Sequence, residues 1–589
     1  MSGHLLVDRV DRDSVTFDPI TLEVIRSALL AATEEMGATL RRSAYSTNVK
    51  TRGDFSCCFL DRHLRVIAQS FAQPVHLGNL VQLVPAALRA YGLDRLGEGD
   101  MVVVNDPYLG NIHLNDVTVI APVYYRDHLF GYLANLAHHV DVGGGAPASI
   151  GAFREIYQEG VQIPPVKLVD HGQVVDDTFR LVLAQIRSRR ETSGDFRAQI
   201  AANITGAARL SELLDHWGLD TVERTIDTVV DVTRRWTQIE IQKLPHGTFR
   251  DECYLDSDGY TTERVRLVAA VTVSDRGVEF DLTGSDLQRP APVNASFGPI
   301  YSACAYALKA LTDPNLPVND GFYDLVRVIA PPGTVVNATH PAPMVGGGEV
   351  QIRLTDLLFK IFSQSMPERV PAGCKAMQCH AGFGGMDYRS GEYYAFLETL
   401  AGGYGGRVES DGPDAVQSHG QNTENAPIEE TEASYPVRIT RYELIPDSGG
   451  AGRRRGGLGL RRDYLFPGPT TFTILADREL EGPWGLFGGK PGHVAEYVLH
   501  RGDTEHRLPS KTTIELKSDD VVSYRTCGGG GYGPPWQREA DRVLADVIDG
   551  KVTSSRAQSD YGVVITEHVI DFEATQRLRA KLAAEVDNG

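Results

Sequence analysis

Residues 101–145 read MVVVNDPYLGNIHLNDVTVIAPVYYRDHLFGYLANLAHHVDVGGG, and this stretch decides the fold of the N-terminal part of the chain. MVVVND predicts a short strand, and PYLGNIHLN predicts a loop rich in glycine, proline and asparagine. The runs DVTVIAPVYY and LFGYLANLAHH are rich in β-formers and flank the tripeptide RDH, which indicates a hairpin. If the turn is centred on Asp127, strand positions equidistant from it pair, so Asp116 faces His138.

The open end of this hairpin gathers groups that bind metals. His113 lies three residues before Asp116, in the loop that enters the same strand, so two imidazoles and a carboxylate converge there. This donor set suits Zn²⁺, Mn²⁺ or Fe²⁺. Asp54, at the mouth of an earlier predicted hairpin, is a candidate fourth ligand. The alternative interpretation is a hairpin end whose histidines, His139 included, only cap strands and bond backbone groups.

Two further polar residues are candidates for supporting roles. His76, in QPVHLGN just before a predicted helix, is a candidate general acid or base. The alternative is a structural histidine with satisfied hydrogen bonds. Asp141 follows the His138-His139 pair and is a candidate acceptor that fixes the tautomer of an imidazole. Its alternative role is that of a turn residue before three glycines.

The rest of the chain alternates between helical and β-rich patterns. Asp18 is the predicted N-cap of a helix that has Pro19 in its first position. DFSCCFLDRHLRVIAQ predicts two strands, and NLVQLVPAALRAYG predicts a helix that ends at Gly92. More helices are expected over about 175–242, and strands follow from about 245. The apolar positions at helical spacing in the first helix are Ile20, Val24, Ile25, Leu29 and Leu30, and later helices are expected near 298–312 and 349–365.

Glycine becomes frequent from about residue 385, in AGGYGG, DSGGAGRRRGGLG, PWGLFGGKPG and CGGGGYGPP. Such segments suit tight turns between strands. We therefore expect a multidomain α/β (α+β) protein with three regions. Helices with mixed sheets and hairpins form an N-terminal metal-bearing region (1–244), which is followed by a central α/β region (245–440) and a glycine-rich, β-rich C-terminal region (441–589).

Composition narrows the class of protein. The chain has 589 residues, 42% of them hydrophobic and 23% charged, which is typical of a soluble globular protein. Its net charge of −19 argues against a nucleic-acid partner, because such proteins are usually basic. Seven cysteines, an odd number, indicate no disulfide framework, and Cys57 and Cys58 are expected in the core. The first residues lack the apolar core of a signal peptide, and no apolar run is long enough to span a membrane, so we expect a cytoplasmic protein.

Several common catalytic motifs are missing. GGGGYG at 528–533 matches the spacing GxGxxG, but Pro534-Pro535 follows where a dinucleotide site needs a helix. The chain contains no GxxxxGK[ST], HExxH or GxSxG, so P-loop ATPases, zincin proteases and α/β-hydrolases are not indicated.

The strings TRGDFSCCFLD, QPVHLGN, VNDPYLGNIHLNDVTVIAPV, LAHHVDVGG, EGVQIPPVKL and GDFRAQIAAN together resemble the hydantoinase B/oxoprolinase family. So do QNTENAPIEE, DSGGAGRRRGGLG, PWGLFGGKPG, GGGGYG and VLADVIDGKVTSSRAQSDYGVV. The matching strings run from about residue 19 to 565, in the order of the family. The chain departs from the family pattern at two places, Asn115 and 185–189. Substrate contacts are expected to differ at 185–189.

The resemblance implies one half of an ATP-dependent pair. The partner is an A-type ATPase subunit similar to acetate kinase and actin, which carries ATP and Mg²⁺. Together such pairs open cyclic amides such as hydantoins, oxoproline and lactams, whereas acetone and acetophenone carboxylases join a ketone to bicarbonate. The segments that hold the family's metal match His113, Asp116 and His138 here, with Asp54 from RGDFS.

We therefore expect the non-ATPase (B-type) subunit of an ATP-dependent cyclic amidohydrolase, in a hetero-oligomer such as α2β2. The partner would phosphorylate the amide oxygen, and this chain would supply a water bound to a divalent transition metal, Zn²⁺ or Mn²⁺. Either His139 or His76 would handle the proton. The alternative is a subunit of a ketone carboxylase, and a third hypothesis is a non-catalytic scaffold for the ATPase.

Overall fold

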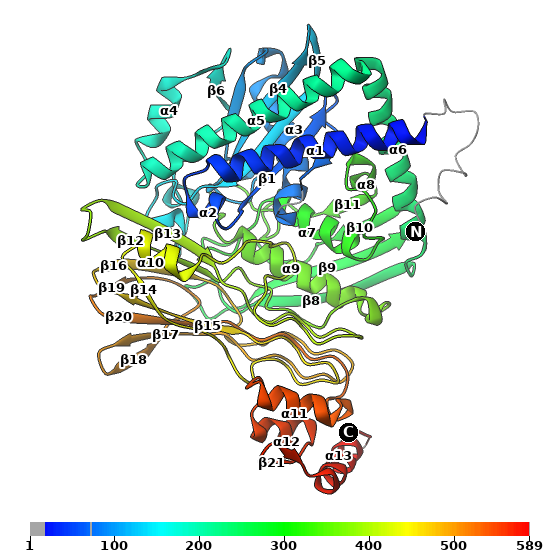
Figure 1. Ribbon diagram of the computed structural model, residues 1–589, viewed down its shortest axis with the longest axis vertical. Coiled ribbons are helices and arrows are strands. Elements are labelled where there is room, and N and C mark those ends of the chain that lie inside the picture. The colour runs from blue at the N-terminus through cyan, green and yellow to red at the C-terminus, as the bar shows by residue number, and fades with distance from the viewer. Residues whose placement is uncertain (1–17, 71–72, 588–589) are drawn as a thin grey trace.

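A seven-stranded sheet organises the N-terminal part of the computed structural model, which describes residues 18–70 and 73–587 (Figure 1). Its strand order is β2-β1-β5-β4-β3-β6-β7, and every neighbouring pair is antiparallel. The strands are β1 (Phe55–Asp61), β2 (Val66–Gln69), β3 (Met101–Val104), β4 (Asp116–Tyr125), β5 (His128–His138), β6 (Val166–Asp170) and β7 (Gln173–Val174).

The hairpin of β4 and β5 has the predicted register over most of its length. Asp116 pairs with His138, as the spacing predicted. Near the turn the register shifts by one residue, because a bulge lies between Val123 and Tyr124. The loop is therefore the two residues Arg126-Asp127, and the left-handed φ of 55° at Arg126 lets it close so tightly. The prediction of a turn centred on Asp127 alone was therefore wrong, because the register shifts by one residue near the turn.

Helices cover both faces of the sheet (Figure 1). Apolar side chains of α1, α5 and α6 share a core with Cys57 and Phe59, whereas those of α3 share a core with Cys58 and Leu60. The two cysteines point to opposite faces because side chains alternate along a strand, and both lie in the core as predicted. These helices are α1 (Pro19–Ser43), α3 (Pro74–Tyr91), α5 (Arg189–Trp217) and α6 (Leu219–Gln242), and two shorter ones are α2 (Thr47–Lys50) and α4 (Asp176–Leu183).

The start of α1 was predicted correctly, but its apolar stripe begins later than expected. The Asp18 carboxylate caps the helix by accepting hydrogen bonds from the backbone of Ile20 and Thr21. Ile25 and Leu29 are buried, whereas Ile20 and Val24 are 72% and 46% exposed. The packing of α1 in the described structure therefore begins at Ile25. The residues before Asp18, which were assessed for a signal peptide, lie outside the described part of the chain.

A second sheet of four strands, β11-β10-β9-β8, completes the largest core. The β10–β11 pair is parallel and the others are antiparallel. Residues of α3, α7 and α9 share one hydrophobic cluster with both sheets, so these helices connect the two. The elements are β8 (Gly247–Leu255), β9 (Val265–Ser274), β10 (Gly277–Asp281), β11 (Val326–Ile329), α7 (Phe297–Ala310), α8 (Asp320–Tyr323) and α9 (Gly347–Phe362).

Two antiparallel sheets, β13-β12-β16-β19 and β14-β15-β20-β17-β18, pack around an aromatic core. Phe383, Phe472 and Tyr464 lie at its centre, and the rings of Phe383 and Phe472 stack 6.0 Å apart. The expected boundary at 440 falls between strands of the first sheet. The elements are β12 (His380–Met386), β13 (Tyr393–Thr399), α10 (Ile428–Ser434), β14 (Arg438–Leu444), β15 (Leu460–Phe466), β16 (Thr470–Leu475), β17 (Glu496–Arg501), β18 (Thr504–Arg507), β19 (Lys511–Leu516) and β20 (Asp520–Arg525).

The glycine-rich segments serve a different purpose from the predicted one. They run side by side as extended chain between the aromatic core and a small C-terminal helical unit (Figure 1). Backbone N–H groups of Gly403, Gly406 and Gly529 bond carbonyls of neighbouring segments, and a Cβ at Gly403 or Gly529 would meet the backbone of another segment at 2.1 Å. Glycine is needed here for close backbone approach rather than mainly for tight turns. The terminal unit comprises α11 (Ala540–Ile548), α12 (Ser554–Tyr561), β21 (Ile565–Thr566), β22 (Val569–Ile570) and α13 (Phe572–Asp587).

Over residues 18–70 and 73–587, none of the helices has both the length and the apolarity that crossing a membrane requires. The overall architecture is the expected mixture of helices and mainly antiparallel sheets in several units.

Candidate functional site

His113, Asp116 and His138 converge at the open end of the β4–β5 hairpin. One ligand atom from each lies within 4.8 Å of those from the other two, and all three residues are buried. His113 Nε2 lies 3.6 Å from Asp116 Oδ2, and the rings of His113 and His138 are 4.9 Å apart. The side chains meet because Asp116 and His138 are cross-strand partners and the loop before β4 turns His113 back toward them.

Asparagine side chains hold the loop that carries His113. The Asn111 amide donates to the backbone carbonyls of Asn105, His113 and Asp116. The Asn115 amide donates to the carbonyls of His139 and Ala148. These buried bonds fix the loop without a helix or strand, so the spacing of the three candidate ligands is set by the backbone. This role was not foreseen from the sequence, although the run of asparagines in NDPYLGNIHLND is its signal.

The donor atoms of this cluster lack partners that buried polar atoms normally have. Both carboxylate oxygens of Asp116 and Nδ1 of His113 are buried and accept or donate no hydrogen bond among the described residues. Burial, together with the charge of Asp54, raises the pKa of Asp116 well above its usual value. Burial lowers the pKa of His113 and of His138 well below theirs, which keeps both imidazoles in the neutral, ligating form. A divalent cation fits this set, because it satisfies the orphaned oxygens and needs neutral imidazoles.

Asp54 and His76 line the same cavity. Asp54 immediately precedes β1, and its carboxylate lies 3.8 Å from His76 Nε2, which is also 3.9 Å from Asp116 Oδ1. His76 lies in the first turn of α3 rather than before it, and its Nδ1 contacts Ser56 Oγ at 3.3 Å. Burial lowers the pKa of His76 to about 4, so this imidazole is neutral between two carboxylates. Its Nε2 can therefore accept a proton and release it again.

His139 does not join this group. Adjacent side chains on a strand point to opposite faces, so His139 faces α5, where its Nε2 bonds Gln199 Oε1 at 2.9 Å and its ring packs against Phe196. Asp141 does not fix an imidazole either. Its carboxylate accepts hydrogen bonds from Arg187 and from the backbone of Gly143. Both residues therefore support the loop and helix behind the hairpin.

A second wall of the cavity comes from residues far along the chain. The cavity holds about 40 Å³ and includes side chains from the β12 and β13 region and the loop after it. His380, at the start of β12, lies 3.9 Å from Glu349, and burial raises the pKa of this carboxyl to about 7. This wall was not foreseen, because it depends on pairing between segments more than two hundred residues apart. Its polar members are Gln378, His380, Thr399, Gln421 and Thr423, and Arg52 and Gln73 from the N-terminal part of the chain complete the cavity.

The sequence of most of the chain matches a known family. The model of the hydantoinase B/oxoprolinase family matches residues 18–535. This chain belongs to the hydantoinase B/oxoprolinase family. The resemblance found in the sequence motifs is thereby confirmed, since the match covers well over half of the chain.

Two curated relatives are named as subunits of enzymes. The beta subunit of a caprolactamase from Pseudomonas jessenii is 34% identical, over 96% of this chain and 99% of that subunit. A protein from Pseudomonas sp. (strain NS671) that is named as the B-type subunit of a D-/L-hydantoinase is 33% identical, over 97% of this chain and 100% of that one. This hydantoinase B/oxoprolinase family member is thus similar, over nearly its full length, to proteins named as subunits.

Solved structures show the same fold. A chain of the ATP-dependent caprolactamase from Pseudomonas jessenii superimposes with a TM-score of 0.89 at 30% identity, covering 96% of this chain and 100% of that one. A chain of nucleotide-free acetone carboxylase superimposes with a TM-score of 0.89 at 20% identity, covering 96% and 83%. The second likeness concerns the fold alone.

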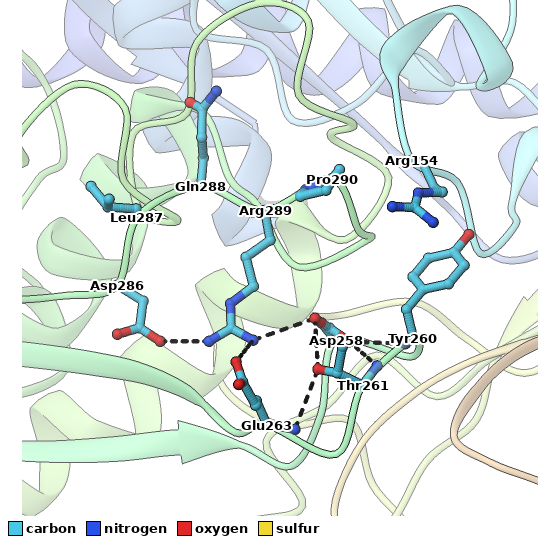
Figure 2. Close-up of a pocket in the computed structure, with 10 residues that line it drawn as sticks. All are labelled: Arg154, Asp258, Tyr260, Thr261, Glu263, Asp286, Leu287, Gln288, Arg289 and Pro290. Carbon is cyan, nitrogen blue, oxygen red and sulfur yellow. Dashed lines mark hydrogen bonds and ion pairs between the residues drawn. The ribbon is translucent and has the colours of Figure 1, made fainter.

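A larger surface pocket in this family member is less suited to chemistry. It holds about 550 Å³, and Figure 2 shows the guanidinium of Arg289 among the lining residues, pointing toward Asp286 and Asp258. The guanidinium lies 3.0 Å from Asp286 and 3.3 Å from Asp258, with Glu263 at 3.8 Å. Because all three carboxylates lie within 4 Å of this guanidinium, the pocket has no orphaned reactive group comparable with Asp116.

A second buried cluster, Asp356, Cys374 and His419, also has metal-ligand spacing. Here both carboxylate oxygens of Asp356 are already hydrogen-bonded. One accepts from His419 and from the backbone of Cys374, and the other accepts from Arg478 and Trp484. Burial alone would raise the pKa of Asp356, but these hydrogen bonds outweigh it and hold the pKa at about 2. The carboxylate of this cluster is therefore satisfied by the protein itself, although Nδ1 of His419 has no partner among the described residues.

Proposed function

We propose that this chain is the non-ATPase subunit of an ATP-dependent cyclic amidohydrolase that opens a hydantoin-, oxoproline- or lactam-like ring. The observation that carries the proposal is the buried cluster of His113, Asp116 and His138, in which both carboxylate oxygens of Asp116 and Nδ1 of His113 lack hydrogen-bond partners. The full-length similarity to subunits named for hydantoinase and caprolactamase supports the substrate class. The chemistry also favours a division of labour, because resonance protects an unstrained amide from attack. An A-type ATPase partner would phosphorylate the amide oxygen and so create a good leaving group.

We assign the metal to His113, Asp116 and His138, with Asp54 as the fourth ligand. A divalent ion bound there, Zn²⁺ or Mn²⁺, would supply Lewis acidity and lower the pKa of a coordinated water. The side chains of this chain would position the ligands and keep the site dry. The asparagine-pinned loop fixes the ligands before the ion arrives, and the surrounding core excludes bulk water.

His76 is the residue that we assign to proton transfer. Its Nε2 lies within 4 Å of both Asp54 and Asp116, and its low pKa leaves it neutral and able to accept a proton. His139, the other candidate from the sequence, faces α5 and is engaged by Gln199.

The test is ATP hydrolysis by the chain reconstituted with its ATPase partner. Hydantoins, lactams and 5-oxoproline should each be offered, and at least one should stimulate ATP cleavage with ring opening. Stimulation only by a ketone with bicarbonate would contradict the proposal and favour a ketone carboxylase, the activity named for the acetone carboxylase whose fold this chain shares. ATP cleavage that no ring or ketone stimulates would leave only the scaffold hypothesis.

A further inference from the structure

The guanidinium of Arg52 is a buried charge on the wall of the metal cavity. Arg52 is 1% exposed, and four of its five N–H groups are engaged. Nε donates to the carbonyl of Glu424, Nη1 to the carbonyl of Leu397 and to Asn48 Oδ1, and Nη2 to Thr399 Oγ1. All four acceptors are neutral.

Arg52 differs in this respect from other buried arginines of the protein. Arg462 lies 3.3 Å from Glu398, Arg478 lies 2.9 Å from Asp356, and Arg538 lies 2.7 Å from a carboxylate oxygen. Arg52 has no Asp or Glu oxygen within 4.0 Å in the described parts of the chain. Asp54 and Glu398 act on its charge only from beyond that distance. Because a buried charge without a directly contacting counter-charge is costly, a closer anionic partner can come from a ligand.

The charge balance of the cavity points the same way. Its charged lining residues are Asp54, Asp116 and Arg52. The proposed function assigns the two carboxylates to a divalent cation, so Arg52 is the charged lining residue that is left without an assigned partner.

The wall around Arg52 offers donors of the right kind. The second hydrogen of Nη2 has no acceptor among the described residues, and the hydroxyls of Thr399 and Thr423 lie 3.0 Å apart beside it. Arginine and hydroxyl groups are the usual partners of carboxylate and phosphoryl oxygens.

We propose that Arg52, with the hydroxyls of Thr399 and Thr423, binds an anionic oxygen group of the ligand beside the metal ligands. This group is a carboxylate carried by the ring or the phosphoryl group of the activated amide. The inference deepens the proposed function and rests on it. It distinguishes this cavity from one built for a wholly neutral ligand.

The test uses the full chain loaded with Mn²⁺, whose unpaired electrons enhance the relaxation of nearby nuclei. The probes are orthophosphate, observed by ³¹P, and 5-oxoproline labelled with ¹³C at its carboxylate. At least one should bind in a Mn²⁺-dependent way and show strong relaxation enhancement, with Zn²⁺-loaded protein as the diamagnetic control. Binding of phosphate alone identifies the phosphoryl group, and binding of 5-oxoproline alone identifies the carboxylate.

Substitutions then test the role of Arg52. Arg52→Gln removes the charge and should weaken binding of the anion at least tenfold, whereas Arg52→Lys should stay within about threefold of the wild type. Arg41→Gln is the matched control: Arg41 also contacts Glu424 but lies outside the cavity, so this change should leave binding unaltered. Should Arg52→Gln fail to fold, Thr423→Val serves instead and should weaken binding severalfold.

Three results would overturn the inference. The first is a Mn²⁺-loaded chain that binds neither anion, which would leave the proposed function standing. The second is unaltered anion binding in Arg52→Gln, or in Thr423→Val where that variant replaces it. The third is failure of Mn²⁺ itself to bind, which would contradict the proposed function as well, so the two failures are distinguishable.

Discussion

His138 is the residue whose loss should separate metal binding from folding. It lies at the end of β5 and pairs with Asp116 through the backbone, so removing its side chain leaves the pairing of β4 and β5 intact. We expect His138→Ala to fold but to lose metal affinity by more than the roughly 10–100-fold typical of losing a residue that only supports a ligand. Metal content after dialysis and the circular dichroism spectrum check the two parts of this expectation.

The matched control for this variant is His128→Ala. His128 begins the same strand, near the turn, and contacts Glu223 there rather than the cavity. This variant should keep a full complement of metal. A His138→Ala protein that also retains stoichiometric metal would show that the ligands are assigned wrongly.

The buried histidine His76 should make the metal-free protein sensitive to acid. Its pKa is about 4 when folded and 6.5 otherwise, so the unfolded chain binds more protons as the pH falls from 6.5 to 4. Stability present above pH 6.5 is therefore lost over this range, by about 2 kcal/mol at pH 5. Thermal unfolding of metal-free protein at pH 7 and pH 5 measures the loss.

Comparison with His76→Gln isolates this effect from other groups. Asp116 and Glu349 have raised pKa values, so they act in the opposite direction and are present in both proteins. The unfolding temperature of His76→Gln should fall less than that of the wild type between the two pH values. Equal falls would mean that His76 is not held neutral by burial.

At the residue scale the sequence predicted the pairing of Asp116 with His138, because a short turn fixes the register of a hairpin. The orientation of His139 was also predictable, since neighbours on a strand face opposite sides. His380 could not be placed beside these ligands, because it reaches the cavity only when segments far apart in the sequence come together, and no local pattern encodes this. Arg52 lies two residues before Asp54, but its contact with the carbonyl of Leu397 could not be predicted for the same reason.

The glycine-rich segments are the elements most sensitive to an added methyl group. A Cβ at Gly529 would lie 2.1 Å from the carbonyl oxygen of Tyr404, which is backbone and has little room to move. We expect Gly529→Ala to destabilise the protein by about 2–3 kcal/mol, the upper part of the range for overpacking. A lower thermal midpoint, or loss of soluble protein, is the readout.

Gly468→Ala is the control for this element. A Cβ at Gly468 would meet only the ring of Tyr388, at 3.7 Å, which is ordinary contact. Its thermal midpoint should stay close to that of the wild type. If Gly529→Ala is equally stable, the segments are not in the close contact described.

At the element scale, helices and hairpins with local signals were predicted from the sequence, such as α1 with its Asp18 cap and α3 ending at Gly92. The role of the glycines was not predicted correctly. A glycine run is compatible with a turn or with close approach of two backbones, and only the position of the neighbouring segment decides between them. The nearest neighbour of Gly403 is Gly529 and that of Gly529 is Tyr404, each more than a hundred residues away in the sequence.

At the scale of the whole molecule, we expect the isolated chain to hydrolyse neither ATP nor ring amides. The sequence has no P-loop motif, and two of the relatives that it matches over nearly their full length are named as subunits. Steady-state assays with the purified chain, with and without its ATPase partner, check this. Turnover by the chain alone would show that a nucleotide site has been overlooked.

The central claim is that His113, Asp116 and His138 hold a divalent metal, and X-ray absorption of the Zn²⁺-loaded chain tests it most directly. The account predicts one ion per chain, with nitrogen and oxygen ligands at about 2.0–2.2 Å, two of them imidazoles, and no sulfur. A sulfur ligand at about 2.3 Å would place the ion at the cluster that contains Cys374 instead. That result, or the absence of stoichiometric metal, would contradict the account.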